Sequence, residues 1–281
     1  MSRLAVLAGC IAVLIGFSGW AEQYSNVAGI FQVPTGARPL GIGGGFLALA
    51  DDENAAFYNP AALGWIKKLG VTSILARPFD VVSYGAVSLA APSFGATYLH
   101  LDSGAIETQD VSVRYLSQGA VVSLGVSAGA VGLGVRGKVY RVTEPYRAQG
   151  WAIDPAFLVV TEVIRAGFLY ENAYSQGVTF DGGHQEDWEK RLRMGAAIRL
   201  PFSEDVLWQG VFEGSGLFSG DPLLAGGIEA WVGGLAARIG YDGWGATFGM
   251  SVMFSSFQID WAYAARLEIV RGHSLSFTFR F

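Results

Sequence analysis

Apolar and polar residues alternate along most of the chain after residue 69. The last nine residues, HSLSFTFRF, place Leu275, Phe277, Phe279 and Phe281 on one register and Ser, Thr or Arg on the other. Because successive side chains of a strand point to opposite faces, this pattern predicts a strand with one apolar and one polar face. Residues 131–140, 191–200, 248–255 and 257–264 show the same alternation. Such stretches are about ten residues long, the length that a tilted strand needs to cross a bilayer.

The connections between the predicted strands alternate between long and tight. The longer or more polar links are 141–150, 171–187, 214–222, 241–244 and 266–272, and the tight ones are 160–162, 201–204, 232–234 and 254–257. Outer-membrane barrels have long external loops and short periplasmic turns. Residues 115–135 carry no charge and could be taken for a membrane helix, but Ser and Gly recur at alternate positions. We expect two strands there, with a turn near Gly129.

Composition separates a membrane barrel from a soluble sheet. Of the 281 residues, 51% are hydrophobic and 15% are charged, against roughly 25% charged in an ordinary soluble domain. A soluble β-sandwich would explain the alternation but not this low charge. We therefore expect an all-β, transmembrane outer-membrane barrel of about 14 antiparallel strands, because closure pairs every backbone group in hydrocarbon. Fifteen candidate strands are visible, and since such barrels have an even number, the segment 69–77 is the one that could belong elsewhere.

The first 21 residues have the features of a secretory signal. Arg3 precedes an apolar run over residues 4–20, and the small residues Gly19 and Ala21 predict cleavage after Ala21. Two alternatives are a single N-terminal membrane helix and a lipobox, LAGC, with Cys10 as the lipidated residue. Cleavage after Ala21 leaves a mature chain without cysteine, which excludes disulfides and a thiol nucleophile.

Residues 22–68 lack a sustained period of two and contain two plausible short helices. Asp51 or Asp52 can cap the first helix. Asn59 and Pro60 form a favourable N-cap and first position for the second, which runs toward Trp65. A compact helical segment before a barrel predicts a small N-terminal hatch inside the lumen. The expected organisation is therefore a signal peptide at 1–21, a hatch at 22–68 and the barrel at 69–281.

The segment GARPLGIGGGFLALADDENAAFYNPAALGW resembles the N-terminal signature of FadL-type transporters of hydrophobic compounds and their PorV-like relatives. The matching residues are Ala50, Asp51, Asp52, Tyr58, Asn59, Pro60, Ala61 and Leu63, and the match departs at Ala62, where the family usually has Gly. The C-terminal FQIDWAYAARLEIVRGHSLSFTFRF is similar to the final hairpin of the PorV-like branch. This resemblance implies a fourteen-stranded barrel, gating at the motif from Asp51 to Ala61, and Phe281 as the signal read by the barrel-assembly machinery.

Many charged residues fall on the polar registers of the predicted strands. They are Arg114, Arg136, Lys138, Arg165, Arg191, Arg193, Arg199, Arg238, Arg280, Asp154, Glu213, Glu229 and Asp260. Arg136, Lys138, Arg191, Arg193 and Arg199 are the candidate lumen charges. They could attract an anionic head group, or form an ion-pair network between barrel and hatch. We favour the network, because charges on the lipid face would cost several kcal/mol and buried charges need partners.

No catalytic, metal or nucleotide site is expected. His100, His184 and His273 are the only histidines, and His273 next to Ser274 points to the opposite face of its strand. Asp181, His184, Glu186 and Asp187 lie in a polar loop and are expected to be solvated. The run GIGGGF lacks the Lys-Ser/Thr of a phosphate-binding loop. The net charge of −5 gives no basis for a nucleic-acid partner. No cofactor is expected.

Two functions fit these observations. The first is passive uptake of small hydrophobic compounds such as fatty acids across the outer membrane, with Asn59 and Pro60 shaping the hinge of a hatch. The second is a PorV-like, non-transporting role as an outer-membrane partner in protein secretion or surface presentation. Expected partners are outer-membrane lipid and the barrel-assembly machinery, with a hydrophobic ligand in the first case and secretion-system proteins in the second. A plain open porin ranks third, because a filled mouth would block water flow.

Overall fold

The computed structural model of the chain describes residues 29–77, 82–107, 112–217, 222–266 and 271–281. The helical elements are η1 (Gly29–Gln32), α2 (Ala37–Gly41), α3 (Ala55–Tyr58) and η2 (Pro60–Trp65). The strands are β1 (Gly70–Ala76), β2 (Ser83–Ala91), β3 (Phe94–Glu107), β4 (Ser112–Ala128), β5 (Val131–Glu144), β6 (Ala148–Val160), β7 (Ile164–Glu171), β8 (Tyr174–Phe180), β9 (Gln185–Glu186), β10 (Arg191–Pro201), β11 (Val206–Ser215), β12 (Leu223–Val232), β13 (Leu235–Tyr241), β14 (Gly245–Phe254), β15 (Phe257–Arg266) and β16 (Arg271–Arg280).

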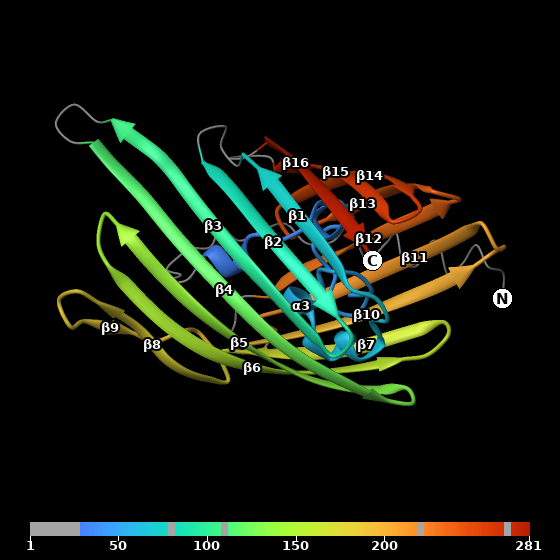
Figure 1. Cartoon of the computed structure of the whole chain (residues 1–281), viewed down its shortest axis with the longest axis horizontal. Helices are drawn as coiled ribbons and strands as arrows, with labels where there is room; N and C mark the ends of the chain where they lie inside the picture. The colour runs from blue at the N-terminus through green and yellow to red at the C-terminus, as the bar shows by residue number, and fades with distance from the viewer. Residues whose placement is uncertain (1–28, 78–81, 108–111, 218–221, 267–270) are drawn as a thin grey trace.

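The strands form one closed antiparallel barrel (Figure 1). First and last strands pair along their length, from Gly70 opposite Arg280 to Ala76 opposite Ser274. Two of the barrel strands are interrupted, so that each consists of two shorter segments. β7 and β8 both pair with β6, and β10 and β9 pair with β7 and β8 in turn. The sixteen segments of the described residues therefore make a 14-stranded barrel, as the sequence predicted.

The apolar registers face outward. Leu133, Met250 and Phe279 are 57%, 60% and 51% exposed, whereas their polar neighbours Ser251 and Thr278 are buried. Such an exterior suits contact with acyl chains, because lipid offers no hydrogen-bond partners. Among the described residues, no helix is both long enough and apolar enough to cross a membrane.

Arginine substitutions on the outer face should cost stability according to depth. Met250→Arg lies in the middle of β14, and Leu235→Arg lies at the start of β13, beside the turn at 233–234. If the outer face contacts lipid, we expect the first to cost about 2–4 kcal/mol and the second about 0–1 kcal/mol. Urea unfolding of the refolded variants in lipid vesicles measures both. Equal costs would contradict a lipid-facing exterior.

The strand boundaries confirm some of the predicted connections and contradict others. The turn near Gly129 is confirmed, because β4 ends at Ala128 and β5 begins at Val131. The segment 69–77 supplies β1, a wall strand. The predicted long links at 171–187 and 141–150 are wrong, because β8 and β9 occupy much of the first and strands extend into the second from both sides. The predicted signal peptide, 1–21, lies outside the described residues.

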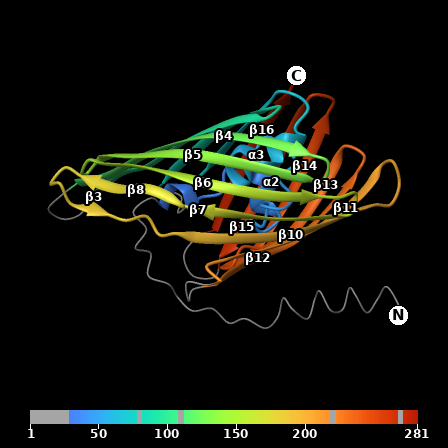
Figure 2. The ribbon, with the colours of Figure 1, turned by 90° about the horizontal axis from the view of Figure 1, so that it is seen from below.

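The hatch, residues 29–65 in the described structure, lies within the ring of strands. Figure 2 shows α2 and α3 inside the barrel. Ile42, Phe46, Leu49 and Leu63 are fully buried there. The barrel has two distinct ends, and we call the end with the turns at 92–93, 129–130, 161–163, 202–205, 233–234 and 255–256 the short-turn end. η2 lies toward this end, because Ser127 donates to the Gly64 carbonyl at 2.8 Å.

Candidate functional site in the barrel lumen

Glycines in the wall let the hatch approach the strands closely. A Cβ atom added to Gly125 of β4 would lie 1.9 Å from the Pro60 carbonyl oxygen, and one added to Gly134 of β5 would lie 2.3 Å from the Ala61 nitrogen. Contacts this short have no room for any side chain. The two hatch residues Pro60 and Ala61 therefore pack directly against wall backbone.

Asn59 both shapes the hatch and attaches it. Its side-chain oxygen accepts from the Ala61 N–H at 3.1 Å, which caps η2 as the sequence predicted. Its amide nitrogen donates to the Leu47 carbonyl at 3.0 Å, so it ties two parts of the hatch together. The predicted cap by Asp51 or Asp52 is wrong. α3 starts later, after Asn54, and Asp52 instead accepts from the Asn54 N–H at 2.8 Å.

Substituting Asn59 should separate these two roles. Asn59→Ala loses the cap and the amide donor in a fully buried position, and we expect a cost of about 1–3 kcal/mol. Asn59→Ser keeps an acceptor for the cap and loses only the donor, so it should cost less. Protease cleavage of the hatch in the detergent-solubilised barrel compares the two. Cleavage of both variants at the wild-type rate would contradict the assigned contacts.

Arg38 is the centre of a buried ion cluster that joins hatch to wall. It contacts Asp51 at 2.6 Å and Asp52 at 2.8 Å within the hatch, and Glu229 of β12 at 2.8 Å. Arg238 of β13 also pairs with Glu229. Burial by itself would raise the pKa of the Asp51 carboxyl, but the Arg38 and Arg165 charges outweigh it and lower that pKa. The cluster therefore holds an ionised Asp51.

A second ion network joins the hatch to strands from β5 to β11. Arg136 contacts Asp154 at 2.6 Å and Glu171 at 2.8 Å, and it also donates to the Phe57 carbonyl of the hatch. Lys138 contacts Asp154 at 3.0 Å. Arg193 joins Glu213 at 2.5 Å, and Glu213 accepts from the hatch N–H of Leu47 at 3.1 Å. Two networks of charge-assisted bonds thus hold the hatch to the barrel.

Aromatic side chains fill the lumen on the other side of the hatch from the short-turn end. Phe31 of η1 packs 5.9 Å from Trp188 and 6.4 Å from Tyr140, measured between ring centroids. Trp188 lies between β9 and β10 and is buried although both of its sequence neighbours are exposed. The Lys138 ammonium lies 5.4 Å from the Phe31 ring and 5.2 Å from the Trp188 ring. This aromatic cluster gives the lumen an apolar section.

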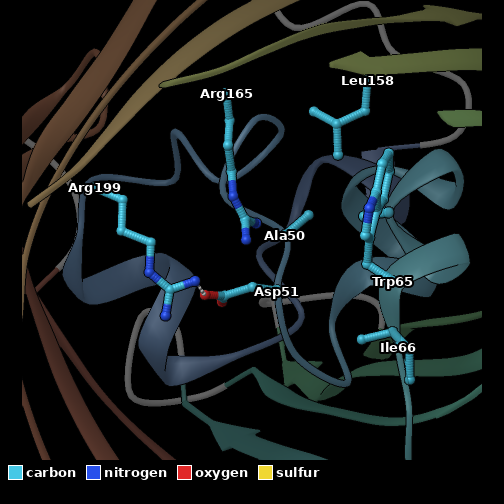
Figure 3. Close-up of a pocket in the computed structure, with 8 residues that line it drawn as sticks. Ala50, Asp51, Trp65, Ile66, Leu158, Arg165 and Arg199 are labelled. Carbon is cyan, nitrogen blue, oxygen red and sulfur yellow. Dashed lines mark ion pairs between the residues drawn. The ribbon is translucent and has the colours of Figure 1, made fainter. Parts of the chain in front are cut away.

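A cavity of about 220 Å³ lies between hatch and wall near the turn at 161–163. Its lining residues are Ala50, Asp51, Ala62, Trp65, Ile66, Leu158, Arg165 and Arg199. Figure 3 shows Arg165 and Arg199 extending from the wall toward Ala50 and Asp51 of the hatch. Arg199 Nη1 lies 3.9 Å from Asp51 Oδ2. Arg165 Nη1 donates to the Leu49 carbonyl at 2.5 Å.

The structure distributes the predicted site residues among these features. Arg136, Lys138 and Arg193 lie in the second ion network, Arg199 lines the cavity, and Arg191 pairs with Glu189 at 2.9 Å outside both.

Tyr58 is buried against Phe46 and Phe57, with ring centroids 5.4 and 5.3 Å away. Phe281 is 75% exposed at the end of β16. Arg114, placed on a polar register, is 45% exposed and pairs with Asp102. It lies three positions before the buried Ser117 of the same strand and therefore faces outward, so its predicted inward register is wrong.

Two residues of the site were missed from the sequence. Arg38 stands inside the hatch segment that carries the family resemblance, yet no role was assigned to it. A lone cation shortly before an acidic pair is a signal that could have found it. Trp188 sits in a polar run, GHQEDWEK, that looks like a solvated loop. Trp188 is placed between two strands that pair elsewhere, since β9 pairs with β8 and β10 pairs with β7.

Solved structures of outer-membrane barrels are similar to this chain. A TodX monoaromatic hydrocarbon channel mutant, deltaS2S3, superposes with a TM-score of 0.57 at 12% identity over 82% of this chain and 95% of that one. The deltaS2 mutant of TodX gives 0.53 at 14%, over 86% and 96%. Omp33 from Acinetobacter baumannii gives 0.50 at 7%, over 78% and 100%. No family model and no curated protein matches the chain.

These likenesses show the fold. The chain has the architecture of an outer-membrane β-barrel. At 12–14% identity the likeness to TodX shows the fold alone, and these structures give no support to the PorV-like branch.

Proposed function

We propose that this protein is an outer-membrane channel for passive uptake of small hydrophobic compounds. The carrying observation is the lumen, which is filled by a buried hatch and lined in part by the aromatic cluster of Phe31, Tyr140 and Trp188. A filled lumen excludes free flow of water and ions in this conformation. Apolar walls favour apolar ligands, because transferring an apolar surface out of water is favourable.

Two further observations support this function. The fold is similar to that of TodX, a monoaromatic hydrocarbon channel, although that likeness at 12% identity carries the fold alone. The outward apolar registers suit a bilayer, and the short turns then lie on the periplasmic side. A ligand would enter at the aromatic cluster and leave at the short-turn end. Passage requires the hatch to shift, since Pro60 and Ala61 pack directly against wall backbone.

Uptake in living cells tests the proposal. The full chain is expressed in a host whose own uptake of hydrocarbons and fatty acids has been removed, and accumulation of radiolabelled toluene and of a long-chain fatty acid is measured. We expect accumulation above that of the host with an empty vector. A barrel that reaches the outer membrane at normal levels without raising accumulation of either compound would overturn the proposal.

The same cells separate the alternative role. If the chain instead serves as a non-transporting partner, affinity purification from detergent-solubilised membranes should capture secreted proteins or a secretion channel, with no change in uptake. Isolation of a lone barrel from cells that accumulate toluene favours the channel.

A further inference from the structure

Two cations face the cavity beside Asp51 with little to neutralise them. Arg165 of β7 pairs in register with Ala197 of β10, so Arg199 is its diagonal neighbour on the same inner face. Like charges at neighbouring positions of one sheet face repel. Asp51 is the single carboxylate in the lining, and its other oxygen is already held by Arg38 at 2.6 Å. Its contact to Arg199 is long, at 3.9 Å, and its charge is shared among Arg38, Arg165 and Arg199.

The Arg165 guanidinium has N–H donors that are not used in hydrogen bonds. Within the described residues it makes no ion pair, and its Nε is buried without a hydrogen-bond partner. A guanidinium carries five N–H donors in a planar fork that matches the two oxygens of a carboxylate. One donor is used on the Leu49 carbonyl. The remaining donors suit an anion that enters the cavity.

Four apolar or aromatic side chains complete the lining of this compact cavity. Ala62, Trp65, Ile66 and Leu158 form its other walls. Its volume of about 220 Å³ lies below the roughly 300 Å³ at which pockets for drug-sized ligands begin. This size excludes a long acyl chain and fits a single ring. Trp65 offers a flat aromatic face for such a ring.

We propose that this cavity binds a compact aromatic carboxylate, with the carboxylate between Arg165 and Arg199 and the ring against Trp65 and Leu158. The exposed Lys67 and Lys68, which directly follow the lining residues, add positive charge at this end of the barrel. A role for the cavity as the last binding site before release rests on the proposed function. The binding itself does not.

Binding of benzoate to the purified, detergent-solubilised protein tests the inference. Titration calorimetry compares benzoate with benzamide, its neutral analogue of the same shape. We expect benzoate to bind and benzamide to bind at least 10-fold more weakly. Arg199→Gln should weaken benzoate at least 10-fold. Arg77→Gln, at an exposed position just after β1, is the matched control and should leave the affinity unchanged.

A second measurement guards against loss of folding and locates the ligand. Arg199 is only partly buried and Arg199→Gln keeps the Arg165 contact to the hatch, so this barrel should fold, as heat-modifiable migration on a gel reports. Benzoate should also change the tryptophan fluorescence of the wild type, and this change should disappear in Trp65→Phe. Equal benzoate affinity in wild type and Arg199→Gln, or an unchanged fluorescence response in Trp65→Phe, overturns the inference.

The outcome is separable from that of the proposed function. Toluene uptake without benzoate binding would remove only the carboxylate site. Benzoate binding without uptake of any compound would remove only the channel.

Discussion

Arg38→Met should release the hatch from the wall while leaving the barrel closed. The substitution keeps an apolar stem of similar length but leaves Asp51, Asp52 and Glu229 without their shared cation in a buried cluster. Removing one partner of a buried ion pair costs about 3–5 kcal/mol, because the remaining charge is left uncompensated. The wall itself is held by backbone ladders that do not involve Arg38. The loss should therefore fall on the attachment of the hatch.

Limited proteolysis and planar-bilayer conductance measure this release. We expect the hatch of Arg38→Met to be cleaved at least 10-fold faster than that of the wild type, and open-channel steps to appear that the wild type lacks. Arg38→Lys keeps the charge without the planar fork and should fall between the two. Arg77→Met removes an exposed arginine outside the cluster and serves as control. An intact, protease-resistant hatch in Arg38→Met would show that the cluster does not hold it.

The faces of the strands could be predicted from sequence because a period of two depends on no partner. Leu133, Met250 and Phe279 face outward as the alternation required. A one-residue error in register would have turned each of them inward. The sequence did not predict a strand where the alternation of apolar and polar residues was weak. YSQGVTF and its neighbours have turn-like composition, and β8 forms there because β6 offers an unpaired edge beyond β7.

The candidate site was harder to predict because its contacts are distant in sequence. Arg38 and Glu229 are 191 residues apart, and no local pattern links them. The inward register of Arg165 and Arg199 could be predicted, yet nothing in the strands indicated that Trp65 and Ala62 of the hatch would complete a cavity with them. By contrast, Asn59 and Pro60 form their cap within three residues, and there the sequence sufficed.

Gly134→Val should also displace the hatch from the barrel wall, but through steric overlap instead of the loss of an ion cluster. A Cβ at Gly134 would lie 2.3 Å from the Ala61 nitrogen and 2.5 Å from the Pro60 carbonyl carbon. Because these are backbone atoms, no flexible side-chain tip can move aside. Overpacking typically costs about 1–3 kcal/mol. Overlap with backbone atoms at these distances should cost at least as much as the top of that range. We therefore expect η2 to be displaced from its position against β5.

Gly137→Val lies on the same strand and provides the matched control. A Cβ at Gly137 meets nothing within 4 Å, and the residue faces outward. There valine should be neutral or mildly stabilising, because β-branched residues suit strands. Hatch proteolysis and bilayer conductance should change in Gly134→Val and stay at wild-type values in Gly137→Val. If both variants keep a protected hatch and show no open steps, the close seating of Pro60 and Ala61 on the wall glycines does not keep the lumen closed.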